Sequence, residues 1–187
     1  MSVVTMIEEP ESAEVREFYD LLDRTSRGLG VLNVFKVMAH TPELMKAWWG
    51  MMTVLLTRLE LPARDRELAI LRLFQIKGGA YGFAHHVRIG KQAGITDQQI
   101  ADLSLHQESP LFDGHDRLIL RYTDAVTRLD ENAPTIAEQV RRSLGERQLV
   151  ELTFCIANWN LMVFILEPLQ IEMEEATKPY LPANWRG

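Results

Sequence analysis

Two side chains on either side of a glycine pair have the types and the spacing for acid–base chemistry. Glu67 precedes Gly78-Gly79, and His86 follows it. If the glycines end one helix and the next folds back against it, the two residues differ in height by about four residues, or roughly 6 Å. A carboxylate beside an imidazole orients its tautomer and suits it to proton transfer. The same pair could also be a purely structural contact between two helices.

Tyr81 and His85 belong to the same predicted helix as His86. Tyr81 is near enough to His86 to line a shared site and supply a phenolic donor, or to pack as an ordinary aromatic residue. His85 points roughly 100° away from His86 on a helix. We therefore expect His85 to face solvent, a neighbouring subunit or a substrate rather than the Glu67–His86 pair.

Three further residues are candidates for holding a substrate. A guanidinium forms paired hydrogen bonds with a carboxylate, so Arg72 and Arg88 could bind one, although either could be a surface charge. Trp48 opens a stretch rich in tryptophan and methionine, residues 48–52, that could line an apolar pocket. At helical spacing such residues are more often core or subunit interface.

Histidine and cysteine spacing does not indicate a metal site. The histidines are His40, His85, His86, His106 and His115. None has the i, i+4 histidine partner that builds ligand sets on helices. Cys155 is the only cysteine, which excludes an intrachain disulfide and a cysteine-rich metal site. We expect no metal and no cofactor.

The elements that must position these residues are all predicted to be helices, because apolar residues recur at helical spacing and strand-like alternation is absent. Thr41-Pro42 opens one helix, which ends before Pro62. The helix that carries Glu67 stops at Gly78-Gly79, and the helix that carries His86 covers about 81–93 and closes at Gly94. Thr96 and Gln99 form a capping box for a short helix.

The last part of the chain is predicted to contain two helices separated by Gly145. The second, about 146–167, is apolar on most sides, so we expect it to be central, because a helix without a polar face must be surrounded. Its opening, Glu146 to Leu149, weakly echoes Asp65 to Leu68, which is compatible with a duplicated helical unit. The fold class is all-α, with about eight or nine helices in one domain over residues 1–187.

A longer motif surrounds Glu67 and His86. The segment Pro62 to Arg72, followed by residues 81–89 and 93–95, resembles the carboxymuconolactone decarboxylase and alkylhydroperoxidase D-like family, and the family-like core covers about 32–172. In the alkylhydroperoxidase branch the pattern is Glu, eleven residues, Cys-x-x-Cys, three residues and His. Aligned on Glu67, it places Gly79 and Gly82 at the two cysteines. Thiol peroxidases need a reactive thiolate and a resolving partner, so we expect that activity to be absent.

The resemblance supports two hypotheses from different classes. The first is a cofactor-free, decarboxylase-like lyase that transfers protons on a small carboxylated or lactone-type metabolite, with Glu67, His86 and Tyr81 as catalytic residues. Arg72, Arg88, His85 and Trp48 would then contact the substrate. The second is a non-catalytic oligomeric binding or scaffold protein. A pocket that contains both Glu67 and His86 favours the enzyme, and a filled core there favours the scaffold.

Composition limits the remaining partners. The chain has 187 residues, is 47% hydrophobic and carries a formal net charge of -6, which argues against a nucleic-acid surface. We see no signal peptide and no uninterrupted membrane span, so we expect a cytoplasmic protein with no membrane partner. The resemblance implies self-association as trimers or hexamers, with a dimer also possible.

Overall fold

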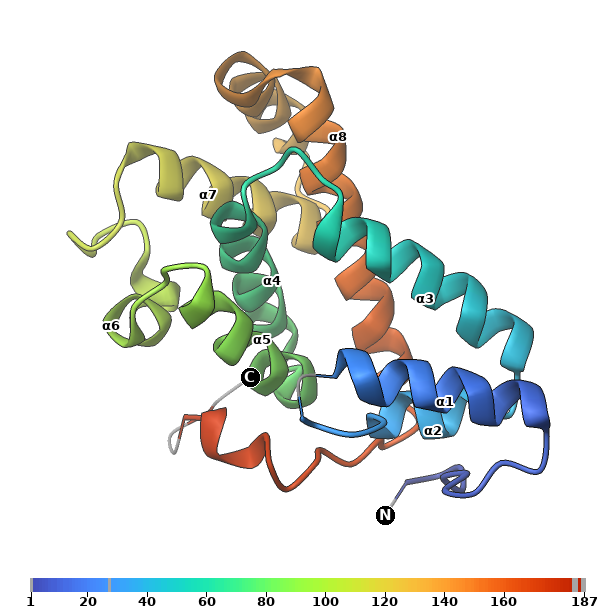
Figure 1. Cartoon of the computed structure of the whole chain (residues 1–187). Helices are drawn as coiled ribbons and strands as arrows, with labels where there is room; N and C mark the ends of the chain where they lie inside the picture. The colour runs from blue at the N-terminus through green and yellow to red at the C-terminus, as the bar shows by residue number, and fades with distance from the viewer. Residues whose placement is uncertain (1, 27, 183–184, 186–187) are drawn as a thin grey trace.

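The computed structural model describes residues 2–26, 28–182 and 185, and this part of the chain is helical without strands. It contains eight α-helices and two short 3₁₀ helices, η1 and η2 (Figure 1). In chain order they are α1 (Ala13–Thr25), α2 (Asn33–Met38), α3 (Pro42–Thr57), α4 (Ala63–Lys77), α5 (Ala80–Gln92), α6 (Asp97–Ala101), η1 (Leu103–Leu105), α7 (Gly114–Arg128), α8 (Ala133–Leu166) and η2 (Lys178–Tyr180). The predicted fold class is confirmed.

The central helix is α4, which packs against α5, α7 and α8. Figure 1 shows it enclosed by these three helices. Every residue from Asp65 to Phe74 is buried, whichever side of the helix it lies on. The polar residues in this run must therefore find partners inside the protein, because an unpaired buried charge is costly.

The expectation that the helix at 146–167 is surrounded is wrong for a single chain. Val150, Phe154, Leu161 and Phe164 are exposed on one side of α8. The opposite side is buried against α4 and α7. The helix is apolar on most sides, but only part of its surface is covered.

Glycine geometry explains how α4 and α5 fold into a hairpin. Gly78 ends α4 with φ 70° and ψ 17°, a left-handed conformation that costs glycine little. Ala80 starts α5 two residues later. The hairpin holds the side chains of α4 and α5 at one fixed register.

Thr96 and Gln99 form the predicted capping box of α6, with both reciprocal hydrogen bonds present.

The element α8 consists of two helices that meet at a kink at Gly145, as predicted. Gly145 has φ 85° and ψ 171°, a combination that only glycine adopts readily. The predicted boundary therefore lies at the correct residue. The backbone leaves the helical conformation at Gly145, changes direction and continues as a second helix.

After α8 the chain returns along the far end of the molecule. Figure 1 shows this terminal segment passing below α5 toward η2, and η2 packs against α5. The Glu174 carboxylate accepts a hydrogen bond from the backbone N–H of Asn33 at 2.7 Å. The C-terminal segment thus brings an acidic group to the side of α5 that faces α2.

Candidate functional site

The hairpin brings Glu67 and His86 into direct contact. Nδ1 of His86 lies 2.7 Å from Oε2 of Glu67. Glu67 is 0% exposed and His86 is 6% exposed. The pair meets without an intervening water, as the register of two antiparallel helices allows.

Both nitrogens of His86 are occupied. The indole Nε1–H of Trp159 donates to Nε2 of His86 at 2.7 Å, so Nε2 is an acceptor and the proton must be on Nδ1, which donates to Glu67. A second proton on Nε2 would place two N–H donors against each other. The arrangement fixes one neutral tautomer and leaves no ring nitrogen for a substrate.

Phe74 fills the space beside the two glycines that stand at the cysteine positions of the motif. A Cβ atom on Gly79 would lie 2.7 Å from Cδ1 of Phe74, and a Cβ on Gly82 would overlap the same ring. The Phe74 and His86 ring centroids are 5.8 Å apart. The space that two sulfur-bearing side chains would need is therefore occupied by an aromatic ring.

Tyr81 and His85 meet at Glu174 instead of at His86. The Tyr81 hydroxyl donates to Oε1 of Glu174 at 2.8 Å, and Nε2 of His85 lies 2.6 Å from Oε2. Burial and the neighbouring Glu174 carboxylate raise the pKa of Tyr81 well above its ordinary value. Burial alone would raise the pKa of Glu174, but its hydrogen bonds with His85, the Asn33 backbone and Tyr81 lower it. Glu174 is absent from the sequence-based candidates because it lies in a segment without a motif.

A mostly apolar cavity of about 330 Å³ lies between α1, α3 and α5. We call it the Arg66 cavity. Its lining residues are Leu22, Thr25, Ser26, Leu29, Gly30, Leu32, Phe35, Trp49, Thr53, Leu56, Thr57, Arg66, His85, Arg88 and Ile89. Two of the predicted site residues, His85 and Arg88, therefore line one cavity. Neither Glu67 nor His86 does.

Arg66 is the functional candidate that sequence reasoning missed. Its Nε donates to Oε1 of Glu67 at 2.9 Å, and its Nη1 lies 3.1 Å from the carbonyl oxygen of Leu56. No described residue makes a hydrogen bond with Nη2 of Arg66, and this atom is not completely buried. Arg66 is 6% exposed and lines the cavity, so Nη2 is the donor that this buried cation has left for a ligand there. In the run Arg64-Asp65-Arg66-Glu67 it looks like an ordinary surface charge.

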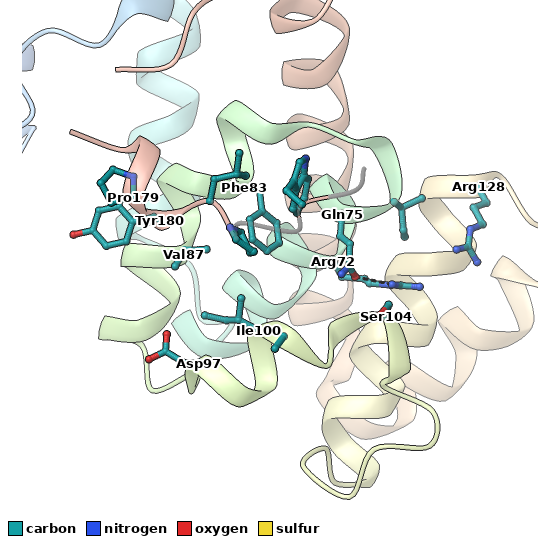
Figure 2. A pocket seen from close by; sticks show the side chains of 15 residues that line it. Arg72, Gln75, Phe83, Val87, Asp97, Ile100, Ser104, Arg128, Pro179 and Tyr180 are labelled. Carbon is teal, nitrogen blue, oxygen red and sulfur yellow. Dashed lines mark hydrogen bonds between the residues drawn. The ribbon is translucent and has the colours of Figure 1, made fainter. Parts of the chain in front are cut away.

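Arg72 is separated from this site and fully engaged elsewhere. It lines a second, larger cavity of about 770 Å³ beside α6, α7 and η2 (Figure 2). Its Nε and Nη2 donate to the two carboxylate oxygens of Asp124 at 2.6 and 3.0 Å, and its Nη1 donates to Gln75 at 2.8 Å. The predicted role in substrate binding would require Arg72 to leave these partners.

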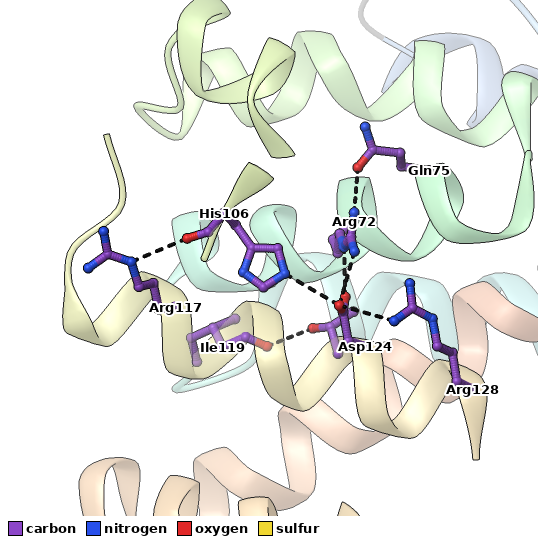
Figure 3. A network of polar contacts seen from close by, with 8 residues as sticks. Arg72, Gln75, His106, Arg117, Ile119, Asp124 and Arg128 are labelled. Carbon is purple, nitrogen blue, oxygen red and sulfur yellow. Dashed lines mark hydrogen bonds and ion pairs between the residues drawn. The ribbon is translucent and has the colours of Figure 1, made fainter. Parts of the chain in front are cut away.

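Asp124 joins three elements through a polar network (Figure 3). It lies 3.3 Å from Nε2 of His106 and 3.4 Å from Nη1 of Arg128. Burial would raise the pKa of Asp124, but hydrogen bonds from His106 and Arg72 and their charges lower it to about 2. This network holds α4, α7 and the loop after η1 together.

Trp48, predicted to contact the substrate, is a core residue. Its indole N–H donates to Oδ1 of Asn158 on α8 at 3.3 Å, and its ring packs 5.5 Å from that of Phe35. Trp49, the next residue, lines the Arg66 cavity. Which of two adjacent tryptophans faces a cavity depends on the rotation of α3, which the motif does not define.

In the described part of the chain, no residues are placed to hold a metal ion or to supply a reactive thiol. No group of three histidine, cysteine or acidic residues there is placed to hold an ion. Burial raises the pKa of Cys155 to about 12. This thiol is buried and stays protonated near neutral pH.

Comparisons with known proteins give a consistent family and fold. Residues 42–125 match the model of the carboxymuconolactone decarboxylase family. A structure from Agrobacterium tumefaciens, of unknown function and described as an antioxidant defence protein AhpD, is 27% identical, with a TM-score of 0.67 over 73% of this chain and 94% of its own. No curated protein matches the chain in sequence.

Two more distant structures share the fold over almost the whole chain. One is an uncharacterized peroxidase-related protein from Silicibacter sp. TM1040, 17% identical, with a TM-score of 0.80 over 100% of this chain and 94% of its own. The other is the debrominase Bmp8 in complex with 2,3,4-tribromopyrrole, 14% identical, with a TM-score of 0.80 over 96% and 97%. At these identities the likeness concerns the fold alone.

Proposed function

Because residues 42–125 match the model of the carboxymuconolactone decarboxylase family and the chain has the fold of AhpD-like proteins, we propose that this protein is a cofactor-free enzyme of that type. Its substrate would be a small carboxylated or lactone-type molecule bound in the Arg66 cavity. The observation that carries the proposal is the buried Arg66, which lines a mostly apolar cavity of about 330 Å³.

The cavity has the composition of a small-molecule site. Ligand pockets are commonly a few hundred Å³ in volume, with apolar walls and a small number of polar groups that orient the ligand. Leu22, Phe35 and Trp49 supply apolar walls, while Arg66 and Arg88 supply cations. A carboxylate in this setting interacts more strongly with a guanidinium than it does in water.

The Glu67–His86 pair would fix the position of the Arg66 side chain. Glu67 accepts from Nε of Arg66 and from Nδ1 of His86, so the guanidinium is held at a fixed orientation. Loss of carbon dioxide from a lactone carboxylate passes the electron pair to a conjugated carbonyl, and the carbon then takes up a proton. Arg66 and Arg88 would hold the acidic group, and a group on the cavity wall must supply the proton.

One observation favours a second candidate, a binding protein without turnover. Phe74 and Trp159 enclose the Glu67–His86 pair, and both nitrogens of His86 are engaged. A filled core at this place is what a scaffold that retained the fold would have. The Arg66 cavity would then bind its ligand and release it unchanged.

Calorimetry with a carboxylate probe and its neutral counterpart tests the binding step. Benzoylpropionate joins a phenyl group, a ketone and a carboxylate, and its primary amide lacks only the charge. We expect the acid to bind and the amide to bind at least about tenfold more weakly, because a charge-assisted hydrogen bond is lost. Equal affinity for acid and amide would contradict a site built on Arg66.

Two variants locate the site. Arg66→Gln should weaken binding of benzoylpropionate by about ten- to a hundredfold, and Leu56→Trp should block it by filling the cavity. Arg128→Gln is the matched control, because Arg128 is an exposed arginine beside the other cavity. Binding that survives both Arg66→Gln and Leu56→Trp would place the ligand elsewhere.

A further inference from the structure

His85 has one ring nitrogen engaged and one available. Nε2 faces the Glu174 carboxylate at 2.6 Å, so Nε2 carries a proton. Nδ1 makes no hydrogen bond with the residues that the structure describes, and this atom is not completely buried. His85 lines the Arg66 cavity, so the lone pair of Nδ1 is the acceptor that this residue has left for a ligand there.

Glu174 is held in place by three groups from two helices, α2 and α5. Oε1 accepts from the Tyr81 hydroxyl at 2.8 Å and from the backbone N–H of Asn33 at 2.7 Å, while Oε2 pairs with His85. These contacts lower the pKa of Glu174 although burial opposes them. An ionised carboxylate at this distance stabilises an imidazolium when one forms.

The ring of His85 is fixed from a second direction. Tyr81 stacks on it, with ring centroids 4.6 Å apart and an angle of 31° between the planes. The side chain of His85 is 10% exposed and that of Glu174 is 12% exposed. A partly desolvated histidine with a fixed orientation, one protonated nitrogen and one open lone pair has the form of a general base.

We propose that His85, oriented by Glu174 and Tyr81, is the proton-transfer residue of the Arg66 cavity and acts on carboxylated carbonyl compounds. This inference rests on the proposed function of the cavity. Nδ1 of His85 takes a proton from the carbon next to the carbonyl group, the C–H bond breaks, and its electron pair passes into an enolate. The proton returns from Nδ1 to the same carbon, so the cycle needs no oxidant or reductant.

The neighbouring His86 cannot be the proton-transfer residue. Its Nε2 accepts from Trp159 and its Nδ1 donates to Glu67. The two adjacent histidines therefore have opposite tautomers, with the proton on Nε2 of His85 and on Nδ1 of His86. Only the former leaves a nitrogen open to a ligand.

Nitrogen-15 NMR of the free protein tests the tautomers without any ligand. We expect imidazole shifts that show a protonated Nε2 at His85 and a protonated Nδ1 at His86. His85→Gln and His86→Gln assign the signals, since each removes one set. A protonated Nδ1 on neutral His85 would overturn the proposal, because the cavity would then face a donor instead of a base.

Solvent-deuterium exchange tests the chemistry. In D₂O, the protein should exchange the protons next to the ketone of benzoylpropionate, as followed by proton NMR. His85→Gln should lower the exchange rate at saturating probe by about a hundredfold and change Kd less than about threefold. Glu174→Gln should lower the rate by about tenfold with Kd kept, the split expected of a positioning residue.

The matched control is His115→Gln, which removes a histidine that pairs with Asp65 away from the cavity; it should leave exchange and Kd unchanged. Binding without exchange in the wild-type protein, or exchange undiminished in His85→Gln, would overturn the role of His85 and leave the binding site standing. Failure of the wild-type protein to bind the probe would instead overturn the proposed function itself.

Discussion

His86 holds one hydrogen bond on each ring nitrogen, and this limits what it can do more than its residue type does. Glu67 accepts from Nδ1 and Trp159 donates to Nε2, each at 2.7 Å. All three side chains are buried. At this position the sequence leaves open a catalytic pair or a structural one, and the hydrogen bonds favour a structural pair that supports Arg66.

Removing the indole donor should therefore weaken the fold. Trp159→Phe leaves Nε2 of His86 buried without a partner, which costs about 1–3 kcal/mol, in addition to lost packing. Urea denaturation measures the change in the free energy of unfolding. Trp49→Phe is the control, because the Trp49 indole N–H makes no hydrogen bond with the described residues. Equal losses of unfolding free energy in Trp159→Phe and Trp49→Phe would show that the hydrogen bond from Trp159 to His86 contributes nothing to stability.

Gly79 and Gly82 make the absence of thiol peroxidase activity the firmest prediction from single residues. The purified protein should not reduce cumene hydroperoxide with dithiothreitol as the donor, because neither position carries a thiol. Turnover that persists in Cys155→Ser would contradict this. Replacing both glycines by cysteine should destabilise the protein, since the new side chains collide with Phe74. Phe74→Ala in that background should recover part of the loss.

At the scale of the elements, the break inside α8 rests on one backbone conformation. Gly145 has φ 85° and ψ 171°, and no atom lies within 4 Å of the place where a Cβ would stand. Gly145→Ala should therefore destabilise the fold by about 1–3 kcal/mol through backbone strain alone. Gly50→Ala is the matched control. Gly50 is exposed within α3 with the same free space, so alanine there should leave stability unchanged or raise it slightly.

Asp124 connects α4, α7 and the loop after η1, and the connection should depend on pH. Its pKa in the fold is about 2, below the ordinary value of 3.8. The stabilisation is therefore present above about pH 4 and is lost as the pH falls toward 2, with a magnitude of about 2 kcal/mol. Asp124→Asn should lower the thermal midpoint at neutral pH and flatten its dependence on pH in that acidic range.

Glu138 is the control for this pH dependence. Hydrogen bonds from Arg141 and Arg142 lower its pKa to about 2 as well, but its side chain is 41% exposed. Surface ion pairs contribute little, because water and salt screen them. Glu138→Gln should leave the acid limb of the stability curve unchanged. A flattening equal to that of Asp124→Asn would show that burial is not the deciding factor.

At the scale of the whole molecule, α3 and α8 each expose a row of apolar side chains. On α8 the row is Val150, Phe154, Leu161 and Phe164, and on α3 it is Leu44, Met51 and Val54. The spacing of three, four or seven residues is that of a seam between packed helices. The two helices are linked through Trp48 and Asn158. We propose that these rows pack against another copy of the chain.

Light scattering at micromolar concentration should show an oligomer, with a trimer or hexamer as the implied states. Phe154→Glu and Leu161→Glu should produce folded monomers with unchanged circular dichroism. Leu129→Asp is the control, because Leu129 is 90% exposed outside both rows. A wild-type monomer would contradict the proposal.

By length and composition α8 is also apolar enough to cross a membrane, and 44% of its 18-residue apolar window is buried inside the protein. Flotation of the protein with liposomes would identify lipid as the partner of the exposed rows instead.

Most of the helices, their main boundaries and the proximity of Glu67 to His86 could be predicted from the sequence. These follow from periodicity, capping residues and the register of a hairpin between neighbouring helices, all of which are local properties. Gly79 and Gly82 likewise excluded the thiol chemistry without any coordinates, because a side chain that is absent cannot react.

Only the tertiary structure decided which polar groups face a cavity. Arg66 becomes a candidate because α3 and α5 bury it, and Arg72 loses that role because Asp124, from another helix, occupies it. Glu174 contacts His85 although the two residues are 89 positions apart in the sequence. Such partners are set by packing between segments far apart in the chain, and the short-range spacing of residue types does not encode them.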